Sequence, residues 1–160
     1  MYYRTVYKLD YLDLASKYSK EYDVPVYLVL SIIKSESSFN RNAVSSVGAR
    51  GLMQITEETF NWLKSKKGEE THQFDDMFNP DINIDYGVFF LSLLQKEFSE
   101  EKTVIAAYHA GMNKVSEWLC APPYSSDGVS LSQIPFKDTR HYVIRVYDTK
   151  KMYETLYESK

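Results

Sequence analysis

Glu36 is the carboxylate whose position in the sequence best fits a chemical role. Val29, Ile32 and Ile33 precede it by seven, four and three residues, spacings that share one face of a helix. Glu36 therefore projects from an apolar stripe near the predicted C-terminal end of a helix, where burial and the helix dipole both raise the pKa of a carboxyl group. An acid that stays protonated near neutral pH can serve as a general acid. The alternative is that Glu36 lies beyond the helix end and points into water.

The loop that follows Glu36 offers no second carboxylate. Between Glu36 and Glu57 the sequence contains no Asp or Glu, and its polar side chains there are mainly hydroxyls and amides. Ordinary glycosidases use two carboxyl groups, one as the acid and the other as nucleophile or base. Asp138 could supply a partner from elsewhere in the fold, but the pattern favours a mechanism with one carboxylate.

Other combinations of reactive residues carry less weight. His72, His109, His141 and Cys120 match no common zinc-ligand spacing, so no metal is expected. Cys120 precedes a proline-rich loop with nothing to activate it as a nucleophile, and a single cysteine excludes an intrachain disulfide. We therefore expect neither a metal nor a cofactor.

Helical periodicity runs through nearly the whole sequence and must provide the frame for Glu36. Helices are predicted at about residues 9–18, 25–38, 56–63, 80–98, 104–110 and 113–119, and from 137 to the C-terminal region. Loops are predicted between them, notably at 38–51, 64–73 and 121–134. Asp23, Thr56 and Asn79 are the expected helix N-caps. No stretch alternates long enough to predict a sheet, so the prediction is one all-α domain over residues 1–160.

Composition narrows the function classes. The 160 residues carry a net charge of −3, without the basic surplus typical of nucleic-acid binders, so no nucleic-acid partner is expected. No uninterrupted apolar stretch is long enough to span a membrane, and no signal-peptide pattern opens the chain. Aromatic residues reach 15%, with 14 Tyr, which suits half-buried helix faces or platforms for sugar rings.

Four sequence blocks occur together in one order. They are Ser-Glu-Ser-Ser-Phe-Asn at 35–40, Gly-Ala-Arg-Gly-Leu-Met-Gln at 48–54, Ala-Tyr-His-Ala-Gly at 107–111 and Ile-Pro-Phe-Lys-Asp-Thr-Arg-His-Tyr-Val at 134–143. In this order and at these separations the blocks resemble the lytic transglycosylase family, in particular the catalytic domain of the soluble lytic transglycosylases. The resemblance covers roughly residues 8–150. It implies an all-α, goose-lysozyme-like domain with a substrate cleft.

The resemblance assigns roles to particular residues. Glu36 aligns with the family's single catalytic acid and base, and Tyr108 with the tyrosine that packs against that acid and orients it. The remaining candidates bind substrate or line the site: Ser45, Gly51, Leu52, Met53, Gln54, His109, Asp138 and Tyr142. Two of them depart from the family, which usually has Asn at the position of His109 and Glu at that of Asp138. A histidine can titrate, and Asp has a shorter reach than Glu, so these departures bear on the pH profile and on substrate affinity.

The reaction implied by the resemblance cleaves the bond between N-acetylmuramic acid and N-acetylglucosamine without water and leaves a 1,6-anhydro end. Two other functions stay open. A goose-type lysozyme would hydrolyse the same bond, and a cell-wall-binding or assembly module would bind glycan without turnover.

The expected partners are peptidoglycan glycan strands, with cell-envelope, phage or secretion machinery as further candidates, and the expected state is a monomer. Because peptidoglycan lies outside the cytoplasmic membrane, we expect an extracytoplasmic location. An export signal or membrane anchor would then lie outside the given sequence.

Overall fold

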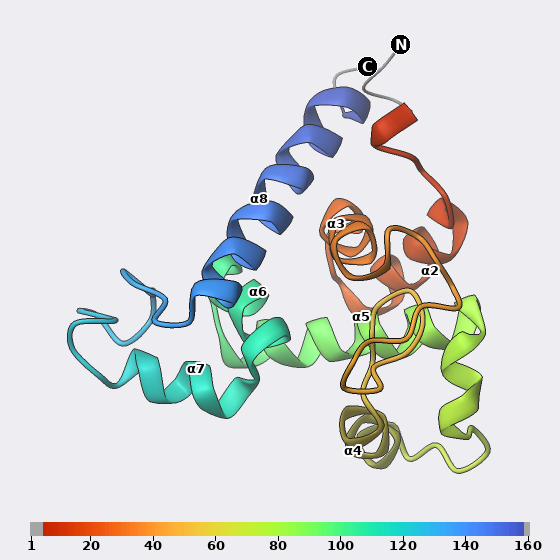
Figure 1. The fold of residues 1–160 in the computed structure, drawn as a ribbon, viewed down its shortest axis with the longest axis horizontal. Coiled ribbons are helices and arrows are strands. Elements are labelled where there is room, and N and C mark those ends of the chain that lie inside the picture. The colour runs from red at the N-terminus through yellow and green to blue at the C-terminus, as the bar shows by residue number, and fades with distance from the viewer. Residues whose placement is uncertain (1–4, 159–160) are drawn as a thin grey trace.

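The computed structural model describes residues 5–158, and these residues form helices joined by loops, without a β-strand (Figure 1). The elements in chain order are α2 (Leu12–Tyr22), α3 (Val26–Ser37), α4 (Glu57–Lys67), the 3₁₀-helix η1 (Phe74–Phe78), α5 (Pro80–Glu97), α6 (Glu101–Ala110), α7 (Met112–Leu119) and α8 (Lys137–Tyr157). The predicted all-α class is confirmed, and so is the long final helix.

Helix α3 packs most extensively against α8. It contacts α2 and α8, while α5 packs against α2, α4 and α6, and α6 packs in turn against α7 and α8 (Figure 1). Five consecutive or near-consecutive side chains of α3 are fully buried, namely Leu28, Val29, Leu30, Ile32 and Ile33. Burial on this scale fixes α3 in rotation and in height, so a side chain at its C-terminal end has a defined direction.

The loop between α3 and α4 is held by two isolated antiparallel bridges, from Val44 to Arg50 and from Arg50 to Ile55. Asn83, which is fully buried on α5, holds this loop through hydrogen bonds of its side chain. Its amide nitrogen donates to the carbonyls of Arg50 at 3.0 Å and Met77 at 2.9 Å, and its oxygen accepts from the backbone N–H of Met53 at 2.8 Å. The loop is therefore tied to both α5 and η1.

Gly51 permits this close packing. Its φ of +76° lies in the left-handed region, and a Cβ there would stand 2.1 Å from the carbonyl oxygen of Met77 and 2.4 Å from the Asn83 amide nitrogen. Any side chain at this position would have to displace backbone.

Helix ends follow the sequence in part. Thr56 and Asn79 cap α4 and α5 as predicted, with side chains that accept from the backbone N–H groups of Thr59 and Asp81. The prediction for Asp23 was wrong: it ends α2 in a left-handed conformation with φ of 55°, and Pro25 stands before α3. The loop predicted from residue 64 was also partly wrong, because α4 runs on to Lys67 and η1 follows at Phe74–Phe78.

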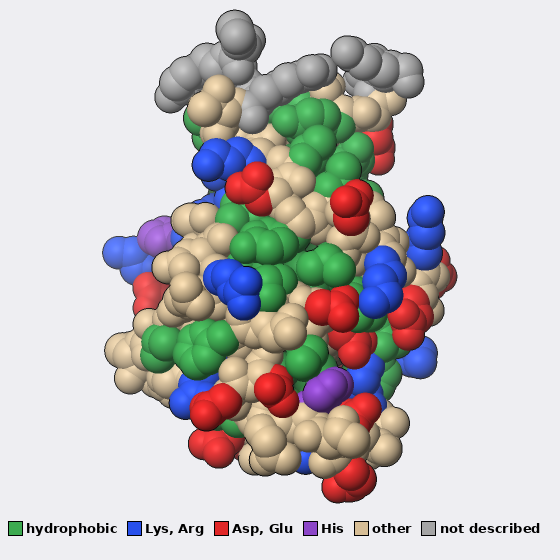
Figure 2. Space-filling view, turned by 90° about the vertical axis from the view of Figure 1, so that its right-hand side faces the viewer, with side chains coloured by type: hydrophobic (Ala, Val, Ile, Leu, Met, Phe, Trp, Pro, Cys, Tyr) green, Lys and Arg blue, Asp and Glu red, His purple; other side chains and the backbone are tan. Residues whose placement is uncertain are grey.

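The face at the right-hand side of Figure 1 carries acidic and basic side chains interspersed with separate hydrophobic patches (Figure 2). Cys120 is a free, exposed cysteine. Among the described helices, none has the length and apolar character needed to cross a membrane.

Candidate functional site

Glu36 lies within α3 as its penultimate residue, so it does not extend beyond the helix end. Burial raises the pKa of its carboxyl group, while a hydrogen bond from Tyr142 and the charge of Arg145 act in the opposite direction. The net direction is upward, as the sequence predicted. Glu36 therefore holds its proton more tightly than an exposed glutamic acid does, and Tyr142 and Arg145 stabilise the carboxylate that forms when the proton leaves.

Tyr142, on α8, is the direct partner of Glu36. Its hydroxyl donates to Oε1 of Glu36 at 2.7 Å across 106 positions of sequence. Burial is the main reason that the pKa of Tyr142 is well above its usual range, so the hydroxyl keeps its proton and remains a donor. The packing of α3 against α8 therefore creates the pair.

His109 lies against the ring of Tyr142. The two rings stack with centroids 4.4 Å apart, and Nδ1 of His109 is 3.0 Å from the hydroxyl of Thr139. Partial burial and Arg145 lower the pKa of His109, and Asp138 acts against them. The imidazole is neutral at neutral pH as a result.

Tyr108, on α6, holds the loop instead of bonding to the acid. Its hydroxyl donates to the carbonyl of Met53 at 2.8 Å, and its ring packs against Phe90 at a centroid separation of 5.2 Å. Burial and the nearby Glu36 hold the pKa of Tyr108 well above its ordinary value. Tyr108 thus connects the wall of the site to the loop that Asn83 anchors.

The loop residues divide into two groups. Ser45 and Gln54 line the same cleft as Glu36, and Gln54 also donates from Nε2 to the carbonyls of Ala43 and Gly51. Leu52 and Met53, in contrast, are fully buried in the core. Met53 fits there because residue 87 is glycine: a Cβ at Gly87 would lie 2.3 Å from the Met53 sulfur. The side chains of Leu52 and Met53 are therefore not positioned to contact glycan.

The cleft at Glu36 has a volume of about 460 Å³. Its lining comprises Glu36, Ser45, Val47, Ala49, Gln54, Ile55, Thr56, Thr59, Phe90, Tyr108, His109, Ala110 and Gly111. Glu36 is the only carboxylate among these described residues. Asp138 is exposed and lines an adjoining pocket with His109 and Thr139.

Asn83, Arg145 and Thr139 contribute to the site and were absent from the sequence-based candidates, as were several residues of the cleft lining, such as Phe90 and Thr59. Asn83 gave a weak signal as a polar residue inside an apolar helix. Thr139 lies within the fourth sequence block and Arg145 lies two residues beyond it, but only the contacts in the structure connect them with the site. No group of three potential metal-binding side chains occurs within residues 5–158.

The all-α fold agrees with the goose-lysozyme-like domain that the resemblance implied, and Glu36 lies in a cleft of that fold. The family model described as Transglycosylase SLT domain matches residues 13–126, and the chain belongs to this family.

Curated relatives are similar over most of this chain. "Membrane-bound lytic murein transglycosylase C" of Serratia proteamaculans is 29% identical over 167 residues, which cover 89% of this chain and 46% of the relative. The protein of the same name from Yersinia pestis is 30% identical with the same coverage. The chain thus spans less than half the length of these relatives.

Solved structures show the same fold. The 70 kDa soluble lytic transglycosylase in complex with bulgecin A matches with a TM-score of 0.88 and 26% identity, over 99% of this chain and 26% of that chain. An inactive mutant of lytic transglycosylase Slt from Pseudomonas aeruginosa matches with a TM-score of 0.82 and 25% identity, over 96% of this chain and 25% of that chain.

Proposed function

We propose that the chain is a peptidoglycan lytic transglycosylase that cleaves the β-1,4 bond between N-acetylmuramic acid and N-acetylglucosamine without water. Glu36 acts first as the acid and then as the base, and the product is a 1,6-anhydromuramic acid end. Membership of the SLT family and the names of the relatives support this proposal.

The observation that carries the proposal is the solitary carboxylate of the cleft. Glu36 has a raised pKa, which suits proton donation, and the cleft lining supplies no second carboxylate as a nucleophile or a base for water. A reaction that uses one carboxylate twice meets this constraint. An internal sugar hydroxyl can replace water because its effective concentration is high.

In the proposed reaction, Glu36 carries out both proton transfers. Glu36 gives its proton to the glycosidic oxygen as the bond from that oxygen to the muramoyl anomeric carbon breaks. The muramoyl N-acetyl oxygen assists at that carbon. The Glu36 carboxylate, stabilised by the Tyr142 hydroxyl, then takes the proton from the 6-hydroxyl of the same sugar. The freed oxygen bonds to the anomeric carbon and displaces the N-acetyl oxygen, which closes the anhydro ring and leaves Glu36 protonated as it began.

The surrounding residues are proposed to hold the glycan. Ser45 and Gln54 present polar groups from the loop side of the cleft, and His109 lines both this cleft and the adjoining pocket that contains Asp138. Tyr108 and Gly51 act indirectly, through the position of the loop. We also propose that the protein works as a monomer in the cell envelope, where its substrate lies.

Mass spectrometry of the products from purified peptidoglycan tests the proposal. The expected muropeptides are lighter than hydrolytic ones by the mass of one water, and they disappear in Glu36→Gln. Glu57→Gln is the matched control, because Glu57 is an exposed carboxylate in the first turn of α4. Full-mass reducing products would make the chain a lysozyme, and glycan binding without products would make it a binding module.

The variant Asp138→Asn distinguishes a mechanism with one carboxylate from a mechanism with two. We expect this variant to keep anhydro-product formation with altered affinity, because Asp138 is exposed and lies in the adjoining pocket. A loss of activity as complete as that of Glu36→Gln would instead show a two-carboxylate mechanism.

A further inference from the structure

A pocket of about 520 Å³ lies beside α8, apart from the cleft at Glu36. This α8 pocket is lined by the first turn of α6, the loop between α7 and α8, and the first half of α8, and it includes Lys102, Arg140 and Ile144. Arg140 and Ile144 each stand two positions from Tyr142, and two residues turn a helix by about 200°. Because Tyr142 bonds to Glu36, the α8 pocket faces away from the acid, and none of its lining residues also lines the cleft.

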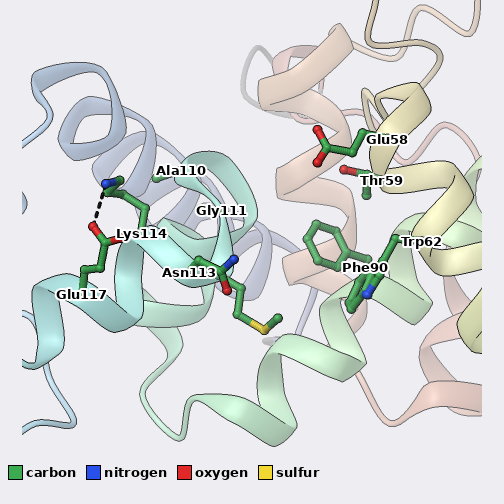
Figure 3. A pocket seen from close by; sticks show the side chains of 10 residues that line it. Glu58, Thr59, Trp62, Phe90, Ala110, Gly111, Asn113, Lys114 and Glu117 are labelled. Atoms are coloured by element: carbon green, nitrogen blue, oxygen red, sulfur yellow. Dashed lines mark hydrogen bonds and ion pairs between the residues drawn. The ribbon is translucent and has the colours of Figure 1, made fainter.

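Two cations line the α8 pocket, and no carboxylate is among its described lining residues. Lys102 and Arg140 are exposed, and neither is within ion-pair distance of a carboxylate in the part of the chain that the structure describes. The pocket between α4 and α7 is different, because Nζ of Lys114 is 2.6 Å from Oε2 of Glu117 and Glu58 adds a further negative charge (Figure 3). The α8 pocket thus keeps two positive charges available for a ligand.

The acidic residues closest in sequence to the α8 pocket have other partners. Glu100 accepts from the backbone of the first turn of α6 at 2.8 Å, and Glu101 pairs with Lys150 at 3.1 Å. Asp127 accepts from two backbone N–H groups of its own loop, each at 2.8 Å. These carboxylates stabilise the elements around the pocket and leave its two cations unpaired.

The walls of the α8 pocket are held by contacts within the protein. Nζ of Lys102 is 4.5 Å from the centroid of the Tyr147 ring, a cation–π contact that keeps the ammonium group against α8. In the loop, the backbone N–H and the hydroxyl of Ser132 both donate to the carbonyl of Tyr124, at 2.8 and 3.0 Å. A ligand would therefore meet a pocket that is already formed.

The other lining groups indicate the kind of anion. Leu131 and Ile144 add apolar surface beside the charges, and Gln133 adds an exposed amide. Lysine and arginine pair well with carboxylates, while an amide and small apolar surfaces suit a peptide backbone and short side chains. The volume is within the range of about 300–1,000 Å³ that is usual for small ligands. These features fit a few residues of peptide better than a bare phosphate ion or the broad surface of a membrane.

We propose that the α8 pocket binds a short acidic peptide, with Lys102 and Arg140 as the partners of its carboxylates. The source of the peptide is the peptide part of the cell wall, a choice that rests on the proposed function. Peptide and glycan are bound on different sides of α8, so the peptide belongs to a strand other than the one in the cleft. The pocket would hold the domain on the wall independently of the strand that it cleaves.

An NMR titration of the wild-type chain tests the proposal. The probe is N-acetyl-L-alanyl-D-glutamic acid, which has two carboxylates, and the matched control is the corresponding diamide, which has none. We expect the acid to shift the backbone amide signals of Lys102 and Gln133 in a saturable way, with a Kd of about 1 mM, and the diamide to leave them unchanged. Equal shifts with both compounds, or no shift with either, would overturn the site.

Variants assign the binding to the two cations. Lys102→Gln and Arg140→Gln are each expected to weaken binding of the acid about tenfold, since each removes one charged hydrogen-bond partner. Lys96→Gln is the matched control, because Lys96 is an exposed cation of α5 that does not line the α8 pocket. An equal loss of binding in Lys96→Gln would reduce the effect to net charge and contradict the proposal.

Other anions provide the competing outcomes. Inorganic phosphate is titrated at the same concentrations, and phosphatidylcholine vesicles with and without phosphatidylglycerol are sedimented with the chain. If phosphate shifts the same signals as strongly as the acid does, the pocket is a general anion site and the peptide assignment is wrong. Sedimentation with the anionic vesicles that is lost in Lys102→Gln, Arg140→Gln would instead assign this surface to a membrane.

Kinetics on the polymer separate this inference from the proposed reaction. On strands that keep their peptides, the double variant Lys102→Gln, Arg140→Gln is expected to raise KM about tenfold with kcat unchanged. On strands stripped of peptides by an amidase, it is expected to match the wild type, and an equal rise in KM on both substrates would refute the peptide site. Peptide shifts without anhydro products from the wild type would refute the proposed reaction and keep the site, whereas anhydro products without peptide shifts would do the reverse.

Discussion

The hydrogen bond from Tyr142 to Glu36 is expected to govern how easily the acid gives up its proton. Tyr142→Phe removes the hydroxyl that lies 2.7 Å from Oε1 of Glu36 and keeps the ring that stacks on His109. The variant therefore isolates one interaction without opening a cavity.

The size of the effect follows from the charge of the acceptor. A hydrogen bond to an ionised group contributes about 1.5–3 kcal/mol. The carboxylate forms when Glu36 protonates the leaving oxygen, so loss of the Tyr142 hydroxyl raises the barrier of that step by up to this amount. At about 1.4 kcal/mol for each factor of ten, turnover is expected to fall about 10- to 150-fold.

The pH profile of kcat is expected to shift in one direction when the Tyr142 hydroxyl is removed. The Tyr142 hydroxyl lowers the pKa of Glu36 against the upward effect of burial, so its removal raises that pKa further. The acid form then persists to higher pH. The alkaline limb of the kcat profile, measured by release of muropeptides, is expected to move to higher pH while the maximum rate falls.

Tyr153→Phe is the matched control. Tyr153 is also a buried tyrosine of α8, and its hydroxyl donates to the carbonyl of Lys8 at 2.8 Å, remote from Glu36. This variant is expected to lose about 1 kcal/mol of stability with an unchanged pH profile. The reasoning is refuted if Tyr142→Phe keeps the wild-type rate and alkaline limb, or if both variants change activity alike.

Three further outcomes are expected. Because burial raises the pKa of Glu36, its ionisation opposes folding, and stability is lost as pH rises from the unfolded towards the folded pKa. Glu36→Gln should therefore have a higher Tm than the wild type at pH 7, by about 2–4 °C for each 1 kcal/mol, and no advantage at pH 4 in calorimetry. Gly51→Ala should unfold at least about 2 kcal/mol more easily in urea, because its Cβ would collide with the carbonyl of Met77. Gly128→Ala provides a comparison, since it too has positive φ but open space around it. His109→Asn should retain more activity than the wild type at a pH below the lowered pKa of His109, because protonated His109 would place a positive charge beside Tyr142, near a reaction centre that itself becomes positive. If the pH–activity profiles of His109→Asn and the wild type fall alike on the acid side, the charge of His109 has no such effect.

Helical periodicity was sufficient to orient Glu36. The residues three, four and seven positions before it are buried, and this local pattern already placed the acid on the packed face of α3. The helix starts at Thr56 and Asn79 were equally local, since each cap depends on backbone groups two or three positions away. Local rules therefore gave most of the elements.

The partners of the acid could not be derived in the same way. Tyr142 and Glu36 are 106 positions apart, and only the packing of α8 on α3 joins them. Asn83 is similar, because its three hydrogen bonds go to separate segments of the chain. The family resemblance named Tyr142 without its geometry and did not indicate Asn83.

Leu52 and Met53 show where a motif can mislead. Their place between Gly51 and Gln54 suggested contact with glycan, but the loop turns their side chains into the core. The space beside Gly87 that accepts Met53 is a property of tertiary packing. The prediction for Asp23 was wrong for another reason. The same side chain suits a helix N-cap and a left-handed residue at a helix C-terminus, and the sequence alone did not distinguish these two positions.

The pairing of α3 with α8 also sets the order in which a ribosome makes the parts of the site. Glu36 is synthesised before the helix that carries its hydroxyl donor, which is the last of the described helices to emerge. A nascent chain therefore holds Glu36 without Tyr142 until α8 has been synthesised. The hydrogen bond between Tyr142 and Glu36 can form only after α8 has packed against α3. The hydrogen-bonded form of the acid therefore depends on this late packing step.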